Sequence, residues 1–201
     1  MVLYLAFILA MTGCGAAGRQ SDNSNADSTN QTVKDNQSSD YNEGAEEENS
    51  QAGKSNGELS EGVMAPDFTA ELTDGSTFSL SEQSGKVVLL NFWATWCGPC
   101  VGEMPAFEKL YTEYGDKVSI LAVNCLEDKE TVNQFVSDGG YTFPVAYDEA
   151  GAINMKYPSE GIPYTLIIDG EGTIQKIYVG AADAETQYQE YKSAIDTVLE
   201  Q

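Results

Sequence analysis

Apolar side chains are concentrated in short runs after residue 62, and polar or glycine-rich turns separate these runs. The runs at 86–93 and 117–125 are almost continuously apolar, which is typical of central strands covered on both faces. The other strand-like runs are shorter, and the last two flank the turn signal Gly170-Glu171-Gly172. The pattern therefore predicts strands at 86–93, 117–125, 143–147, 164–169 and 173–180, preceded by two short strands within 67–80.

Four segments predict helices: 97–114, 129–137, 150–157 and 184–199. Apolar residues recur at helical spacing in the first and last of these, so one face of each is expected to lie in the core. Pro99 falls in the first turn of its helix, where proline is tolerated, whereas Pro105 falls inside it and is expected to kink it. Strands alternating with helices in this order predict a mixed α/β sheet with helices on both faces.

The first 62 residues have a different composition. Residues 2–11 are apolar, but about ten residues are too few to span a bilayer, which needs about 20. They fit the apolar part of a secretion signal. Residues 19–62 contain few large apolar side chains, so they cannot bury enough surface to fold. The expected organisation is a signal peptide at 1–14, a disordered acidic and polar linker at 15–62, and one folded domain at 63–201.

The signal-like segment ends in Thr12-Gly13-Cys14-Gly15. Small residues ending in cysteine resemble the bacterial lipobox, in which the cysteine is lipid-modified and becomes the mature N-terminus. Met11 departs from this pattern, because leucine is usual there. An ordinary cleaved signal ending near Gly13–Ala17 is the alternative. Lipidation of Cys14 would anchor the domain to the outer face of a bacterial membrane, in a compartment where disulfides persist.

The chain carries a formal net charge of −22. Ten acidic and three basic side chains lie in residues 19–62, which leaves −15 for the folded part. There is no basic patch to displace counterions from a phosphate backbone, so nucleic acid is excluded as an expected partner.

The strongest chemical signal is Trp96-Cys97-Gly98-Pro99-Cys100, directly after the apolar run at 86–93. A structural zinc site needs four ligands, but the chain has no histidine, and Cys14 and Cys125 do not form a second pair. We therefore expect no metal and no other cofactor, but a redox-active Cys97–Cys100 disulfide at a helix start, where free N–H groups lower a thiol pKa. A static disulfide is the alternative, although so small a loop adds little stability.

These residues resemble the thioredoxin superfamily, and within it the extracytoplasmic thiol–disulfide oxidoreductases of the TlpA/ResA type. The resemblance covers residues 63–201 and is carried by Ala65–Phe68, by Gly85–Cys100, by Glu103-Met104-Pro105 and by Gly161-Ile162-Pro163. It implies a thioredoxin-like three-layer α/β/α fold with a mixed central sheet. An N-terminal β-hairpin extension and an inserted αβ element between Cys125 and Gly161 are expected in addition.

Within this motif, Cys97 is expected to be the nucleophile, with an exposed sulfur, and Cys100 to resolve the mixed disulfide. Gly98-Pro99 is the dipeptide of reducing thioredoxins, which predicts a reductant. The resemblance places Trp96 at the border of the substrate groove; ordinary packing is the alternative. Trp93 is expected in the core.

Glu103 lies three residues after Cys100 and so on the same helical face. A carboxylate there can accept the proton of Cys100, the role that the resemblance implies. The alternative is a glutamate that merely favours the helix dipole. Asn91 takes the position where cytoplasmic thioredoxin has an aspartate under the dithiol, which increases the expected dependence on Glu103.

The resemblance also implies that the Ile162–Pro163 bond is cis and faces the dithiol, leaving the Ile162 backbone free to pair with an extended substrate strand. A trans turn proline is the alternative. Cys125 ends a strand, and two interpretations stay open: a buried small apolar residue or a third redox thiol.

The expected function is a membrane-tethered reductase of protein disulfides, working as a monomer. The family implies a CcdA-like membrane thiol carrier as electron donor and clients such as apocytochrome c or methionine sulfoxide reductase. A peroxiredoxin-like thiol peroxidase is the alternative. Leu90 and Ala94 stand at the proline and threonine or serine positions of its motif, and the only arginine is Arg19. A copper-delivery protein would normally need Cys-x-x-x-Cys and a histidine.

Overall fold

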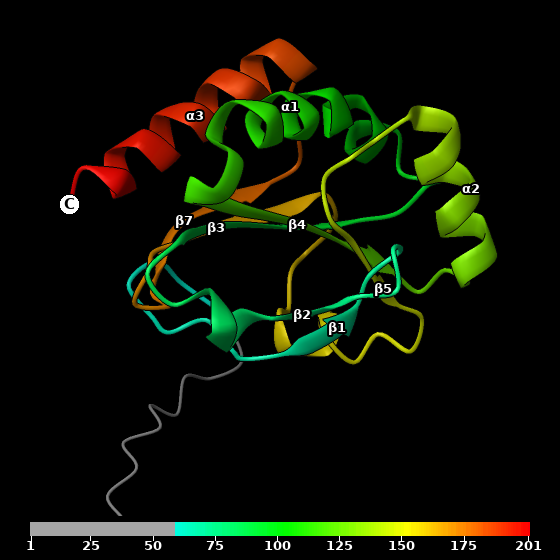
Figure 1. Ribbon diagram of the computed structural model, residues 1–201, viewed down its shortest axis with the longest axis horizontal. Coiled ribbons are helices and arrows are strands. Elements are labelled where there is room, and N and C mark those ends of the chain that lie inside the picture. Colours follow the sequence, from blue (N-terminus) through cyan, green and yellow to red (C-terminus); the bar gives the residue numbers. More distant parts are fainter. Residues whose placement is uncertain (1–58) are drawn as a thin grey trace, which may run out of the picture. The chain divides into compact units, whose positions relative to one another are not determined.

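The computed structural model describes residues 59–201, which Figure 1 colours from cyan to red. The predicted signal peptide, Cys14 and all but the last residues of the predicted linker lie outside this part. The described strands are β1 Thr69–Glu71, β2 Thr77–Ser79, β3 Val87–Trp93, β4 Val118–Cys125, β5 Val145–Asp148, β6 Tyr164–Ile168 and β7 Ile174–Val179. Every strand expected from the apolar runs is present.

Five strands form the central sheet in the order β5-β4-β3-β6-β7, and β1 pairs with β2 in a separate hairpin. Strands β3, β4 and β5 are parallel, whereas β6 and β7 run antiparallel to β3. All residues of β3 are buried, as its continuous apolar run predicts for a central strand. The sheet is therefore mixed, and its middle strand leads directly to the cysteine motif.

Three α-helices accompany the sheet: α1 Gly98–Tyr114, α2 Lys129–Gly139 and α3 Ala184–Leu199. The side chains of Asp128 and Asp183 accept hydrogen bonds from backbone N–H groups in the first turns of α2 and α3. Helix α1 continues past Pro105 to Tyr114. At the end of α2, Gly140 adopts a left-handed φ of 65°, a conformation that glycine takes without strain.

The two faces of the sheet are covered differently (Figure 1). Alternation along β3 sends Leu89 and Trp93 into a core shared with α1, α2 and α3, which we call the helix-side core. Leu90 and Phe92 point into the hairpin-side core, shared with the β1–β2 hairpin and Tyr157. The thioredoxin-like mixed α/β fold, its hairpin extension and its inserted α2–β5 element are confirmed.

The helices expected on both faces are found on one: within residues 59–201, α1, α2 and α3 all pack into the helix-side core, and the layer on the hairpin side has no long helix. The helix expected at 150–157 is reduced to a 3-10 turn at Asn154–Lys156. Gly151 has a left-handed φ of 69°, and the Asp148 carboxylate accepts hydrogen bonds from the backbone N–H groups of Ile153 and Asn154. These local hydrogen bonds form where the first turn of a regular α-helix was expected. The loop expected at 81–85 likewise contains a 3-10 turn at Leu80–Gln83.

The last residues of the predicted linker contact the domain. Glu61 forms a 3.0 Å ion pair with Lys176, and Gly62 N donates a 2.7 Å hydrogen bond to Ile174 O. Within residues 59–201, none of the helices combines the length and the apolar character needed to cross a bilayer.

Candidate active site

The two motif cysteines lie where β3 ends and α1 begins. Cys97 and Cys100 form a disulfide with a Cα–Cα distance of 5.3 Å. Cys97 is the N-cap residue of α1, and Pro99 occupies its first turn, where the missing N–H costs nothing. The predicted pairing and its place at a strand-to-helix junction are thus present in the structure.

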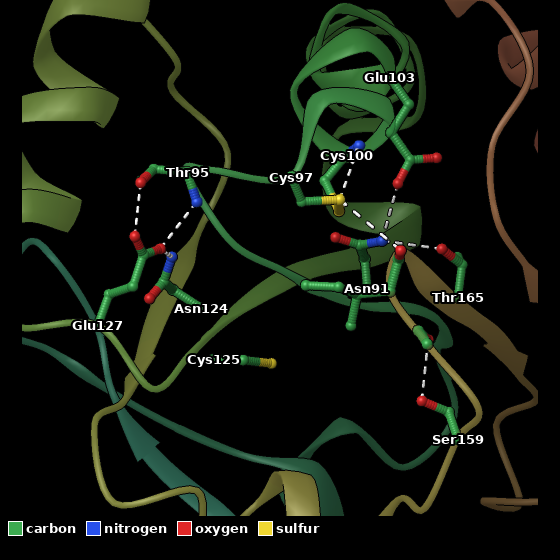
Figure 2. Close-up of a disulfide and its surroundings, with 12 residues drawn as sticks. Asn91, Thr95, Cys97, Cys100, Glu103, Asn124, Cys125, Glu127, Ser159 and Thr165 are labelled. Carbon is green, nitrogen blue, oxygen red and sulfur yellow. Dashed lines mark hydrogen bonds between the residues drawn. A yellow bond between two sulfur atoms is a disulfide. The ribbon is translucent and has the colours of Figure 1, made fainter.

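The helix start polarises the sulfur of Cys97. Its Sγ accepts a 3.3 Å hydrogen bond from the backbone N–H of Cys100 (Figure 2). After reduction, the same N–H and the positive end of the helix would favour the thiolate of Cys97 over its thiol. This arrangement supports Cys97 as the nucleophile.

The exposure of Cys97 is lower than its sequence position suggests. Cys97 is 6% exposed and Cys100 is fully buried. The expectation of an exposed sulfur is therefore wrong for the disulfide form, in which the Ile162 carbonyl oxygen lies 3.7 Å from Cys97 Sγ. The difference between the two cysteines still has the predicted direction, with the first more accessible than the second.

The segment before β6 faces the disulfide. The Ile162–Pro163 peptide bond is cis, as the resemblance implied. Phe92 of β3 is paired with Tyr164 of β6, so the start of β6 lies at the same end of the sheet as Cys97. Pro163 O accepts a 2.8 Å hydrogen bond from Gly180 N, which ties this segment to the end of β7.

Trp96, Gly98 and Pro99 form an exposed rim beside the disulfide. Trp96 is 72% exposed, whereas Trp93 is fully buried, as expected for the core. Gly98 and Pro99 are also exposed. Such exposure favours the interpretation of Trp96 as a groove residue over ordinary packing.

Glu103 is fully buried below the first turn of α1. Its Oε1 accepts a 3.0 Å hydrogen bond from Asn91 Nδ2, and its Oε2 accepts a 2.8 Å hydrogen bond from the Tyr191 hydroxyl. Burial raises the pKa of Glu103 to about 7, although both hydrogen bonds act to lower it. The residue lies beyond the first helical turn and is shielded from solvent, which disfavours a role in the helix dipole alone.

Asn91, Thr165 and Tyr191 complete a closed polar network around this carboxylate. Asn91 Nδ2 also donates to Thr165 Oγ1 at 2.9 Å, and the Tyr191 hydroxyl lies 3.1 Å from the same oxygen. Asn91 and Thr165 are register partners on β3 and β6. Figure 2 shows the Asn91 amide and the Glu103 carboxylate on the same side of α1 as the two sulfurs. Within the described part of the chain, Asn91 Oδ1 has no hydrogen-bond partner.

Sequence reasoning found Glu103 and Asn91 but not Thr165 and Tyr191, which complete the network. Tyr191 lies on the apolar face expected of its helix, a pattern that does not indicate a bond to Glu103, and Thr165 was not singled out. An isolated threonine inside an apolar run is the one hint available, since a buried hydroxyl needs a partner.

A second carboxylate also organises the turn before the dithiol. Glu127 accepts hydrogen bonds from the backbone N–H of Thr95 at 2.7 Å and from its hydroxyl at 2.5 Å. Asn124 Nδ2 donates to the same carboxylate at 2.7 Å. Glu127 thereby joins the loop after β4 to the loop after β3, as Figure 2 shows. The sequence did not single out this residue.

Cys125 lies in the hairpin-side core, whereas Cys97 and Cys100 lie in the helix-side core. It is 5% exposed, and burial raises its pKa to about 11. Its Sγ accepts a 3.4 Å hydrogen bond from Asn154 Nδ2. A protonated thiol on the far side of the sheet fits the interpretation of a buried apolar residue better than that of a third redox thiol.

The arrangement is suited to two-electron exchange between sulfurs. Within residues 59–201, no group of three or more cysteine, aspartate or glutamate side chains is placed to hold a metal ion. The site offers a helix-capped sulfur, a buried second sulfur and a carboxylate whose pKa permits proton transfer near neutral pH.

The Redoxin family model matches residues 60–198. This chain belongs to the Redoxin family.

Two curated proteins are similar to this redoxin over its folded part. The thioredoxin-like protein YneN of Bacillus subtilis (strain 168) is 46% identical over 125 residues, which cover 61% of this chain and 73% of YneN. The thiol–disulfide oxidoreductase ResA of the same strain is 37% identical over 138 residues, or 68% of this chain and 76% of ResA.

A solved structure agrees with these relatives. The structure described as a thiol:disulfide interchange protein DsbE from Chlorobium tepidum superposes with a TM-score of 0.65 at 30% identity, covering 70% of this chain and 99% of that one. Together with the disulfide at the start of α1, these matches identify the redoxin as a thiol–disulfide oxidoreductase of the ResA type, an enzyme that acts on protein disulfides.

Proposed function

We propose that this redoxin is a reductase, which passes two electrons from the Cys97–Cys100 dithiol to the disulfide of another protein. The observation that supports it most directly is Cys97 as the N-cap of α1, with its sulfur held against the N–H of Cys100. Gly98-Pro99 between the cysteines supports the reducing direction, because thioredoxin itself is a reductant with a potential near −270 mV.

The reaction proceeds through a mixed disulfide. The Cys97 thiolate attacks one sulfur of the client disulfide, whose S–S bond breaks and whose other sulfur leaves as a thiolate and takes up a proton. The Cys100 thiol then loses its proton and attacks Cys97 Sγ. The Cys97–Cys100 disulfide forms, the second client sulfur leaves, and the client is reduced by two electrons.

Glu103 is the proton acceptor for Cys100 in this scheme. A base that serves this step must be ionised part of the time and must hold the proton long enough to return it. A carboxylate with a pKa of about 7 meets both conditions at neutral pH. Glu103 would then protonate the departing client thiolate, directly or through water.

The client chain lies along the segment before β6. The Ile162 carbonyl, 3.7 Å from Cys97 Sγ, is positioned to receive a backbone N–H from an extended client segment. Trp96, Gly98 and Pro99, next to Cys97 in the chain, are exposed and would contact the same client segment. These contacts would align the client cystine with Cys97.

We place the enzyme outside the cytoplasm, tethered through lipidated Cys14 after removal of the signal at 1–14. The linker at 15–62 would hold the domain at 63–201 roughly 35–42 Å from its anchor. Electrons would come from a CcdA-type membrane thiol carrier, and apocytochrome c or methionine sulfoxide reductase are the client classes that the resemblance implies. The enzyme would work as a monomer and without a further cofactor. Metabolic labelling with a fatty acid, with Cys14→Ala as control, tests the anchor.

A Cys100→Ser variant tests the reaction. It is expected to trap client proteins on Cys97 as mixed disulfides, and Cys97→Ser is expected to trap none. A redox potential above about −150 mV would contradict the reducing direction, since DsbA-type oxidants lie near −120 mV. Consumption of peroxide without reduction of insulin would favour the peroxidase alternative instead.

A further inference from the structure

Leu126 combines two features that folding alone does not explain. Its backbone φ is 63°, and it is the one non-glycine residue of positive φ within residues 59–201. Leucine is strained in this left-handed region because its Cβ crowds the backbone. Its side chain is nevertheless 67% exposed, so little core packing offsets the strain. A strained, exposed apolar residue at the edge of an active site suggests a role in binding.

Hydrogen bonds connect the loop of Leu126 to the loop that carries the dithiol. The neighbouring Glu127 accepts hydrogen bonds from the backbone and hydroxyl of Thr95, which directly precedes Trp96. Leu126 N donates to Asp148 O at 3.1 Å, so the loops after β3, β4 and β5 meet at the end of the sheet that holds the disulfide. Trp96 and Leu126 therefore belong to one surface, although they are 30 positions apart in the sequence.

Met155 extends this surface beyond Leu126. The Leu126 side chain lies across Gly151, where an added Cβ would come within 2.8 Å of Leu126 Cδ2. Met155 N donates a 2.9 Å hydrogen bond to the carbonyl of the same glycine. Met155 is 76% exposed. Trp96, Leu126 and Met155, which we call the apolar strip, thus project from three adjoining loops.

The loops around the apolar strip carry more acidic than basic side chains. The loop segments 94–97, 126–128, 149–155 and 158–162 contain Glu127, Asp128, Glu149 and Glu160, and no lysine or arginine. Two lysines directly follow these segments and bind other groups. Lys129 pairs with Glu71 at 2.6 Å and also interacts with Glu149, and Lys156 Nζ donates to Asp67 O at 2.8 Å. An apolar surface bordered mainly by acids suits a partner that is both apolar and cationic.

We propose that the apolar strip docks the client segment adjoining its cystine, and that this segment carries an apolar side chain flanked by lysine or arginine. The inference rests on the proposed function, because the client must lie over Cys97 for its disulfide to react. The strained backbone of Leu126 directs its side chain outward at this point. The dithiol supplies the chemistry, and the apolar strip selects which disulfides reach it.

Two cyclic disulfide peptides and one small disulfide test this. In one peptide leucine and two lysines follow the cystine, and in the other serine and two glutamates. Bis(2-hydroxyethyl) disulfide is too small to reach the strip. The wild-type enzyme is expected to have a kcat/KM for the lysine peptide at least about tenfold above that for the glutamate peptide. Leu126→Asn is expected to reduce kcat/KM for the lysine peptide about tenfold more than for the small disulfide.

Matched variants distinguish a loss of client docking from a loss of folding stability. Asparagine tolerates a left-handed φ, so Leu126→Asn is expected to keep the wild-type melting temperature. Leu199→Asn removes an exposed leucine from the end of α3 and is expected to alter neither substrate. Met155→Gln is expected to act on the lysine peptide in the same direction as Leu126→Asn.

Equal losses on peptide and small disulfide would assign Leu126 to the shape of the active site and overturn the docking proposal. Unchanged kinetics, or a preference for the glutamate peptide, would overturn it as well. Failure of the wild-type enzyme to reduce any of the three substrates would instead contradict the proposed reductase function.

Discussion

Cys100 and Cys125 are both buried cysteines at the same end of the sheet, yet their surroundings differ. Cys100 lies in the helix-side core, bonded to a helix-capping cysteine and one turn before a buried carboxylate. Cys125 lies in the hairpin-side core, where burial raises its pKa to about 11 and the amide of Asn154 is its hydrogen-bond donor. Burial alone makes a thiol inert, because it disfavours the thiolate.

The two sites differ in that Cys100 has a nearby carboxylate to accept its thiol proton. The Asn91–Glu103–Thr165–Tyr191 network holds a carboxylate in the interior, where its hydrogen bonds come from an amide and a hydroxyl rather than from a cation. Such a group is costly to ionise, and its pKa of about 7 reflects that cost. The same cost makes it a usable base at neutral pH. The following experiments test whether this network, rather than burial or the helix start alone, separates the reactive site from the inert one.

The largest effect is expected from removing the sulfur of Cys100, compared with the sulfur of Cys125. Cys100→Ala is expected to lower steady-state insulin reduction about a thousandfold or more, because the mixed disulfide no longer resolves. Cys125→Ala is expected to stay within about twofold of wild type. A comparable loss in Cys125→Ala would show that the two sites are coupled, and a Cys97–Cys125 disulfide trapped in Cys100→Ser would identify the route.

The cost of ionising Glu103 is expected to appear in the stability of the oxidised protein. The pKa rises from 4.5 to about 7 on folding, so the folded state holds this proton more tightly than the unfolded state. Its contribution to the free energy of unfolding is therefore fully present below pH 4.5 and is lost as the pH rises through 7. Between pH values well below 4.5 and well above 7, this contribution to the free energy of unfolding changes by about 3 kcal/mol.

Urea unfolding of the wild type and of Glu103→Gln at pH 5 and pH 8 measures this contribution. Glutamine can keep the hydrogen bond from Asn91 but has no charge to bury. The variant is expected to gain stability relative to wild type at pH 8, by up to about 3 kcal/mol. An identical pH dependence in the two proteins would mean that Glu103 is not protonated on folding.

The same substitution is expected to slow the resolving step. General acid–base catalysis contributes about a hundredfold or more, so Glu103→Gln is expected to lower the rate of Cys100 attack by about that factor at pH 8. In the wild type this rate is expected to rise as the pH increases through about 7, where the carboxylate ionises. In the variant the rise is expected to disappear.

Rapid mixing of the reduced protein with a disulfide peptide resolves the second step from the first. Glu130→Gln, which alters an exposed carboxylate in the first turn of α2, is the matched control and is expected to leave the profile unchanged. A retained pH dependence in Glu103→Gln would remove the carboxylate from the proposed mechanism.

The sequence predicted the reactive cysteine pair better than the inert cysteine. Adjacent motif residues, a strand-to-helix junction and a first-turn proline are local features, and all of them could be read along the chain. The location of Cys125 depends on which face of β4 it occupies and on the contact with Asn154, 29 positions away. Such contacts arise from tertiary packing, which periodicity does not encode.

Glu103 shows the same limit at finer scale. Its helical spacing from Cys100 could be predicted, but its pKa depends on burial and on the hydroxyl of Tyr191, which α3 brings from 88 positions away. The short 3-10 turn in place of the helix expected at 150–157 has a similar cause. The Asp148 carboxylate accepts hydrogen bonds from the backbone N–H groups of Ile153 and Asn154, and these bonds compete with those of a helix. The pattern of apolar residues contains no information about that competition.

The smallest effect is expected from Tyr191→Phe, which tests the network without touching sulfur or carboxylate. Phenylalanine retains the ring that stacks on Phe107, with ring centroids 5.7 Å apart, but removes the hydroxyl that donates to Glu103. That hydrogen bond lowers the pKa of Glu103, so its loss is expected to raise the midpoint of the resolution profile by about one pH unit. The plateau rate at high pH is expected to remain near the wild-type value. Tyr188→Phe removes a hydroxyl of the same helix that binds Glu113 instead, and it is expected to leave the midpoint in place. A midpoint that shifts equally in both variants would point to a general effect of α3 packing, whereas a shift confined to Tyr191→Phe would assign the tuning of this carboxylate to a single hydrogen bond.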